Sequence, residues 1–145
     1  MIHIGFEGRL IKSGSWYAVE IPTLLIFSQA KTQKEGLYRA NSGLQELLEA
    51  SGVDGFNSCL TQWVNRKDLL FMVFLPVTQP VIAFMLRQIR GYKEMSLSDV
   101  AKRMGHSSKN SIAAYEKSGG REPTIGKLSE FLQAYGIDAQ VKLMA

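Results

Sequence analysis

Apolar and polar residues alternate in the first part of the chain in the manner of β-strands. The apolar residues Ile2, Ile4 and Phe6 occupy every second position, and Leu10 and Ile11 extend the run. A turn-prone cluster of Lys, Ser and Gly follows at residues 12–15. A second β-prone run covers residues 15–21 and ends at Pro22, and residues 24–28 form a third. The pattern therefore predicts three strands in succession.

The hydrophobic period then changes to that of a helix. Thr32 and Glu35 have the spacing of a capping box, in which a hydroxyl and a carboxylate bond the exposed amides of a helix start. Two more extended runs follow, at residues 59–64 and 69–77. We expect an α+β fold for this block, with one helix packed on one face of a small β-sheet that holds one or two of these runs. The apolar face of the helix comprises Leu37, Ala40, Leu44, Leu47 and Leu48, and Ser51-Gly52 closes it.

The remainder of the chain has helical periodicity. Pro76 and Pro80 mark the boundary, which divides the chain into residues 1–78 and residues 79–145. Four helices are predicted in the second part, as an all-α bundle, and the pattern from residue 137 onward fits either a strand or a fraying tail. The predicted inward-facing residues are Ile82, Met85, Leu86 and Ile89, then Leu97, Val100, Ala101 and Met104, then Ile112 and Tyr115, and finally Ile125, Leu128, Phe131, Leu132 and Tyr135.

Three of these helices have start or stop signals. Ser96 and Ser108 are natural N-caps of the second and third helices, and Pro123-Thr124 opens the fourth. Glycines end each of them, at Gly105, in Ser118-Gly119-Gly120 and at Gly136.

The net positive charge of the chain comes from the second part. Residues 1–82 contain seven Lys or Arg and seven Asp or Glu, whereas residues 83–145 contain ten and six, a balance of +4. A phosphate-binding surface would therefore be sought there. The single cysteine, Cys59, excludes a disulfide framework and a Cys-rich zinc site. With no secretory signal and no membrane-spanning stretch visible, we expect a cytoplasmic protein.

The second and third helices, joined by a tight turn at Gly105, are predicted to form a helix-turn-helix unit. The start of the second helix of such a unit reaches base edges, while the first lies across the DNA backbone. Asn110 can bond adenine bidentately, Lys109 can reach guanine or phosphate, and a small Ala can contact a thymine methyl. The predicted DNA contacts are Ser98, Lys102, Ser107, Ser108, Lys109, Asn110, Ser111, Ala113, Ala114, Lys117 and Arg121.

A helical packing unit with a merely solvated polar face is the alternative interpretation. The order Leu97-x-x-Val100-Ala101-x-x-Met104-Gly105, Ile112-x-x-Tyr115-Glu116 and Pro123-Thr124 favours DNA binding, because it resembles the Cro/C1-type (XRE) helix-turn-helix family over residues 87–136. The resemblance implies that Glu116 forms a structural pair with Arg90. The stretch from Gly105 to Glu116 is one residue longer than the usual family spacing, which places the extra residue in the turn. Since half-sites are spaced a helical turn apart, we expect a homodimer or higher homo-oligomer on double-stranded operator DNA.

The first block shows no catalytic chemistry. It has no phosphate-cradling glycine loop, no metal-ligand cluster and no nucleophile beside a base. His3 and His106 lie far apart in the sequence, and the carboxylates of Glu7, Glu20 and Glu35 are scattered. We therefore expect no enzyme activity, no metal and no cofactor.

A second resemblance concerns this block. The run Trp16-Tyr17-Ala18-Val19-Glu20-Ile21-Pro22, followed by Ser28-Gln29-Ala30-x-Thr32-x-x-Glu35-Gly36-Leu37 and a leucine-rich helix, is similar to the HicB antitoxin family. The resemblance implies a partial ribonuclease-H-like layer that lacks catalytic residues and blocks a HicA-like toxin, a small ribonuclease. It also implies that the C-terminal module represses the protein's own operon.

The sequence thus predicts a non-enzymatic antitoxin that both neutralises a toxin and represses transcription. The alternative is a one-component transcription regulator whose first block binds a small effector or oligomerises. An effector would require a pocket, whereas a toxin would require a broad exposed surface.

Overall fold

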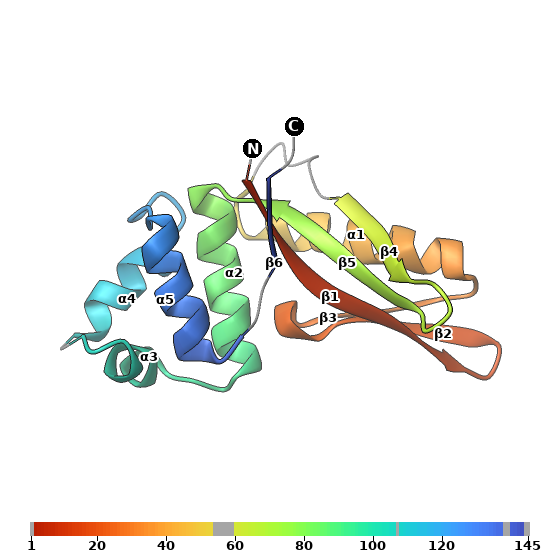
Figure 1. The fold of residues 1–145 in the computed structure, drawn as a ribbon, viewed down its shortest axis with the longest axis horizontal. Coiled ribbons are helices and arrows are strands. Elements are labelled where there is room, and N and C mark those ends of the chain that lie inside the picture. Colours follow the sequence, from red (N-terminus) through yellow and green to blue (C-terminus); the bar gives the residue numbers. More distant parts are fainter. Residues whose placement is uncertain (1, 54–59, 107, 138–139, 144–145) are drawn as a thin grey trace.

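The chain folds into an antiparallel sheet with one helix behind it and a group of helices at one end (Figure 1). The computed structural model describes residues 2–53, 60–106, 108–137 and 140–143. The strands are β1 (Ile2–Ser13), β2 (Trp16–Ile21), β3 (Ile26–Ala30), β4 (Leu60–Asn65), β5 (Leu70–Pro76) and β6 (Gln140–Leu143). The helices are the 3-10 turn η1 (Pro22–Leu24), α1 (Gln33–Ala50), α2 (Gln79–Tyr92), α3 (Leu97–Arg103), α4 (Lys109–Glu116) and α5 (Ile125–Tyr135).

Five strands follow the order β3-β2-β1-β5-β4, and all neighbouring strands are antiparallel. The long strand β1 is central, and its first residues also pair with β6, which returns from the helical part. Gly14, with a φ of 62°, makes the turn between β1 and β2, because only glycine adopts this backbone conformation at little cost. The sheet therefore joins segments from both parts of the chain.

The hydrophobic core lies between the sheet and α1 and continues into the helical group. Ile4, Phe6 and Leu10 alternate on the inner face of β1, and Leu44 and Leu48 face them from α1. The same cluster of buried residues extends through α2 and reaches α5. The boundary after residue 78 stays a prediction, and the core is continuous across it.

Helix α2 is the link between the two parts. Every residue from Val81 to Leu86, and also Ile89, is buried. On the sheet side, the Gln88 side-chain amide donates to the carbonyl of Leu24 in η1, at 2.7 Å. A helical segment that is apolar on all sides, as residues 81–86 are, is typical of one enclosed by other elements.

The structure confirms most of the predicted elements. Residues 33–50 are helical and the Thr32 hydroxyl accepts from the Glu35 amide, while residues 60–65 and 70–76 are both strands. The ambiguous tail includes a strand at residues 140–143. The overall α+β class and the helix-turn-helix part are confirmed, whereas a ribonuclease-H-like arrangement is not.

Three local expectations were wrong. Residue 24 belongs to η1, and the left-handed Leu25 (φ 56°) delays the third strand to residue 26. The carboxylate of Glu35 accepts from the Lys31 amide, so the capping box at Thr32 is only half formed. Ile125 is 60% exposed, because the first turn of α5 projects beyond the core. Cys59 and Ser107 lie outside the described residues. No helix among the described residues is long and apolar enough to cross a membrane.

Candidate nucleic-acid interface

Helix α3 starts at a complete capping box. The Ser96 hydroxyl accepts from the Asp99 amide at 3.0 Å, and the Asp99 carboxylate accepts from the Ser96 amide at 2.9 Å. These bonds from Ser96 stabilise the charged carboxylate and lower the pKa of Asp99. Val100 and Ala101 are buried, while Ser98 and Lys102 are exposed. The helix thus leaves polar side chains on its outer face.

The turn after α3 uses a left-handed glycine. Gly105 has a φ of 73°, and the amide of His106 donates back to the carbonyl of Ala101 at 2.8 Å. Ser108 then caps α4, since its hydroxyl accepts from the Asn110 amide at 3.1 Å. A short turn thereby joins the two short helices, as in a helix-turn-helix.

Helix α4 has one buried and one exposed side. Ile112 and Tyr115 face the core, where the Tyr115 ring meets Phe131 of α5 edge-on with centroids 5.2 Å apart. Lys109 and Asn110 are exposed at the start of the helix. Side chains able to bond base edges therefore stand free at the N-terminal end of α4, where a recognition helix presents them.

The C-terminal end of α4 is fixed to α2 by charge. The Arg90 side chain donates to both carboxylate oxygens of Glu116, with Nε at 2.9 Å from Oε2 and Nη2 at 3.0 Å from Oε1. Glu116 is 6% exposed, and its hydrogen bonds raise the pKa of Arg90. Arg87 donates to the backbone carbonyl of Glu116. Two arginines of α2 thus hold one residue of α4.

A glutamine fixes the loop after α4. The Gln79 side-chain amide donates to the carbonyl of Lys117 at 2.8 Å, and its oxygen accepts from the amide of Gly119 at 2.9 Å. The following Arg121 donates its amide to the carbonyl of Ala114, and its guanidinium lies 5.2 Å from the Tyr115 ring centroid. The loop is therefore tied to α2 and α4 at both ends.

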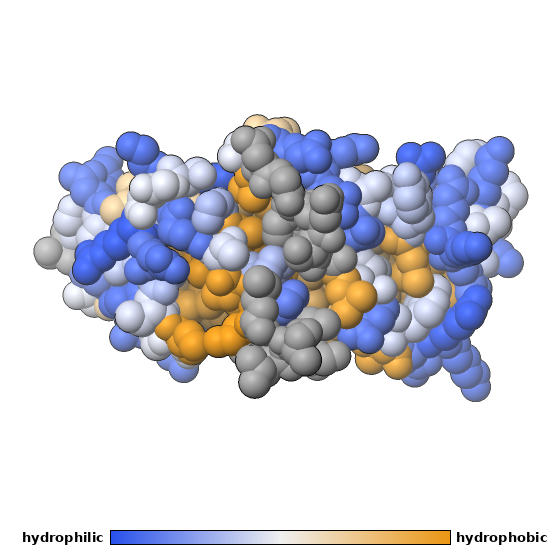
Figure 2. All heavy atoms as spheres, turned by 90° about the horizontal axis from the view of Figure 1, so that it is seen from above, coloured by the Kyte–Doolittle hydropathy of each residue, from blue (hydrophilic) through white to orange (hydrophobic). Residues whose placement is uncertain are grey.

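The predicted DNA-contacting residues gather on α3, on α4 and in the loop after α4, at the end of the molecule farthest from the sheet. Figure 1 shows α3 and α4 at that end, and Figure 2 shows it covered mainly by hydrophilic residues. Of the predicted contacts, the exposed ones are Ser98, Lys102, Ser108, Lys109, Asn110, Lys117 and Arg121, while Ser111, Ala113 and Ala114 are half-buried. Ser111 donates its hydroxyl to the carbonyl of Ser108 at 2.7 Å.

Sequence reasoning missed three residues that position this end. Arg87 lies three positions before Arg90, so helical spacing could have placed it on the same face. Gln79 bonds a loop about forty residues away, and Arg103 donates to the carbonyl of Ala134, which lies in α5. No local sequence signal marks contacts at such separations.

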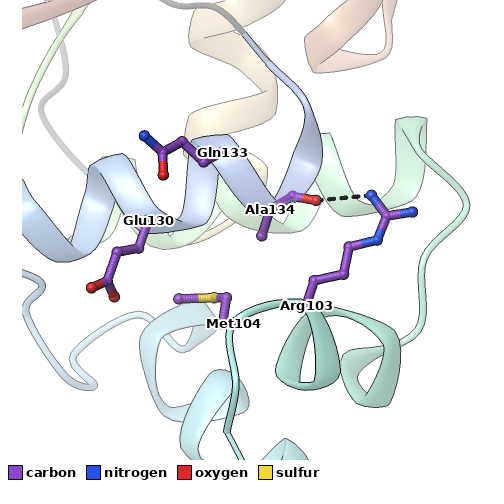
Figure 3. Close-up of a pocket in the computed structure, with 5 residues that line it drawn as sticks. All are labelled: Arg103, Met104, Glu130, Gln133 and Ala134. Atoms are coloured by element: carbon purple, nitrogen blue, oxygen red, sulfur yellow. Dashed lines mark hydrogen bonds between the residues drawn. The ribbon is translucent and has the colours of Figure 1, made fainter.

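A cleft of about 460 Å³ lies between α3 and α5 (Figure 3). Arg103 and Met104 line one side and Glu130, Gln133 and Ala134 the other. The Arg103 hydrogen bond to Ala134 crosses it at 3.1 Å. Glu130 is paired with Lys127 at 2.7 Å, and that bond lowers the pKa of Glu130. The charged side chains of this cleft therefore already have partners within the protein.

The paired short helices, the exposed start of α4 and the arginine-held end of α4 define a helix-turn-helix DNA-binding module. The family comparison agrees: residues 86–141 match the family model described as helix-turn-helix, of the Cro/C1 type. That match indicates sequence-specific DNA binding and transcription regulation. No curated protein matches the chain.

Proposed function

We propose that the chain is a transcriptional repressor that doubles as an antitoxin of the HicB kind. The observation that carries the DNA-binding half is the exposed start of α4, with Lys109 and Asn110 free, on a helix whose other end is held by Arg90 and Glu116. Such a helix can enter the major groove without rearranging. Exposed Lys102 and Lys117 are suited to the flanking phosphates.

The antitoxin half is supported by the sequence resemblance of residues 16–37 and by the element order that follows. Three strands, a helix and further strands precede the DNA-binding module, in the order that the resemblance implies. On the open side of the sheet, Trp16 of β2 is an exposed large apolar residue that a partner protein could cover.

Two clefts in the described sheet part are small, which favours a macromolecular partner over a small effector at either of them. One cleft, beside Thr23 and Tyr92, measures about 210 Å³, and another, beside Trp16 and Gln29, about 240 Å³. Ligand pockets of drug-sized molecules usually span about 300–1,000 Å³. These two clefts are therefore small for an effector site.

Co-purification tests the proposal directly. The tagged chain is expressed together with the reading frames that neighbour its gene, and the eluted proteins are identified and assayed for ribonuclease activity with and without this chain. A stoichiometric small ribonuclease that this chain inhibits would support the antitoxin half. A chain that elutes alone and still protects its own promoter from nuclease would reject that half and favour a one-component regulator.

A further inference from the structure

The strand β3 forms one edge of the sheet, and its own residues carry no feature that protects an edge; the exposed Lys31, which follows it, lies over the Trp16 ring of β2. Its five residues, Ile26–Ala30, contain no charge and no proline, and they pair with β2 without a register shift. Among the described residues, no backbone group of β3 bonds outside the β2 ladder. An unprotected edge of this kind is a template for another strand.

The opposite edge differs. Strand β4 contains a bulge between Trp63 and Asn65, and the turn that follows carries the exposed Arg66 and Lys67. Bulges and charges are the usual means by which proteins prevent edge-to-edge pairing. One edge of this sheet is thus protected and the other is left open.

Large apolar side chains stand exposed at the open edge. Phe27 is 61% exposed on the outer face of β3, and Leu25, just before the strand, is 40% exposed. Phe27 lies opposite Glu20 of β2, whose charge is paired with Arg9 at 2.9 Å. The patch is therefore apolar and without an unpaired charge in its nearest row, as a surface covered by a protein would be.

We propose that β3 pairs antiparallel with β3 of a second copy, about a two-fold axis at Ser28. This register opposes all five residues of each strand, so Ile26 faces Ala30 and Phe27 faces Gln29 of the other copy. The two Phe27 rings become diagonal neighbours on one face, within reach of each other. No like charges meet, because β3 has none. The pairing is self-complementary, as a two-fold interface requires.

The open edge is closely linked to the helices that hold α4. Gln88 of α2 bonds the carbonyl of Leu24, two residues before β3, and Arg90 on the same helix holds Glu116. Pairing of two β3 strands therefore fixes two copies of α4 relative to each other, as two operator half-sites need. This consequence rests on the proposed function, whereas the pairing itself does not.

Sedimentation of the full chain without DNA tests the interface. We expect the wild type to sediment as a dimer and Phe27→Lys as a single chain, because two lysines would meet across the axis. Val64→Lys is the matched control, since Val64 is also 61% exposed but lies on β4. Circular dichroism reports whether each variant is folded. A monomeric wild type, or a folded Phe27→Lys variant that remains dimeric, overturns the proposal.

Cross-linking tests the register in which Ser28 of one copy lies opposite Ser28 of the other. Its result is the formation of a covalent dimer, which an unfolded variant could not imitate as a simple loss of association. In a Cys59→Ser background the Ser28→Cys variant has one thiol, and oxidation should join two chains in a form that persists on a non-reducing gel. Val64→Cys in the same background is expected to stay uncrosslinked. Absence of the Ser28→Cys dimer overturns the pairing.

Operator affinity separates this inference from the proposed function. We expect Phe27→Lys to bind a two-half-site operator at least tenfold more weakly than Val64→Lys does. If the wild type dimerises through β3 but binds no operator, the proposed function fails and the interface stands. If a monomeric wild type binds the operator as tightly as Phe27→Lys does, the interface fails and the proposed function stands.

Discussion

The guanidinium of Arg90 joins the middle of the protein to the recognition helix by donating to both carboxylate oxygens of Glu116, with Nε at 3.1 Å from Oε1 and 2.9 Å from Oε2. Its Nη1 also donates to the carbonyl of Met95, just before the cap of α3. One side chain of α2 thus holds both the approach to α3 and the end of α4. The relative placement of the two short helices depends on it.

Loss of this pair is expected to destabilise the helix-turn-helix. Glu116→Ala leaves Arg90 with a partly buried, uncompensated charge, and such changes cost about 3 kcal/mol or more. Urea unfolding of the wild type and the variant measures the loss. The double variant Arg90→Met with Glu116→Met should recover much of the stability, since it leaves no unpaired charge. Equal losses in the single and the double variant would contradict this account.

Lys109→Ala and Asn110→Ala are each expected to weaken operator binding without unfolding the protein. Both side chains are exposed, and loss of a bidentate base contact by Asn110 costs about 1–3 kcal/mol of discrimination. Fluorescence anisotropy with labelled operator measures the affinity. Lys34→Ala, an exposed lysine on α1, is the control and should bind as the wild type does. Unchanged affinity in both test variants would mean that α4 is not the reading helix.

Tyr135→Phe is expected to stabilise the protein. The Tyr135 hydroxyl is buried and has no hydrogen-bond partner among the described residues, and such a group costs about 1 kcal/mol or more. Burial raises the pKa of Tyr135 above the ordinary value. The folded state therefore favours the neutral phenol, so its stability is intact below the unfolded-state pKa and falls as pH rises above it.

Thermal unfolding between neutral and alkaline pH checks both effects of Tyr135→Phe. The variant should melt at a higher temperature at neutral pH and should lose less stability than the wild type as the pH approaches and passes the ordinary tyrosine pKa of 10.0. A variant that melts lower at neutral pH would show that the hydroxyl is stabilising after all.

Gly8→Ala is expected to destabilise the sheet. A methyl group at Gly8 would lie 2.3 Å from ring atoms of Phe71 and 3.0 Å from the backbone oxygen of Glu20. Overpacking of this kind typically costs about 1–3 kcal/mol. Chemical denaturation compares it with Gly126→Ala, where the nearest atom is 3.8 Å away and space is sufficient. A Gly8→Ala variant as stable as the Gly126→Ala control would contradict the tight contact between β1 and β5.

Short sequence patterns predicted the features that depend on contacts between residues close in the sequence. The caps at Ser96, Ser108 and Thr124 form as expected, because a cap depends on residues two or three positions away. The expected partner of Glu116 required the family resemblance, since nothing near Arg90 in the sequence indicates a bond across 26 positions.

Contacts between distant segments were beyond sequence reasoning. The polar residues of the reading helix could be identified from helical spacing, whereas the brace that Gln79 gives to the loop after α4 depends on how two elements pack. The start of β3 was misplaced because Leu25 takes a left-handed conformation that its type rarely adopts. Tertiary packing, which a single sequence does not display, decides both.

The pairing of β6 with Ile2–Gly5 of β1 also determines when the sheet can be completed. During translation, β1 is synthesised before the helix-turn-helix part and β6 is synthesised after it. During that interval residues 2–5 of β1 have no β6 to pair with, although β5 can already pair with the other edge of β1. Contacts so distant in sequence form slowly. The nascent protein therefore keeps this edge of β1 unpaired until residues 140–143 can reach it, and an unpaired strand edge promotes aggregation during that interval.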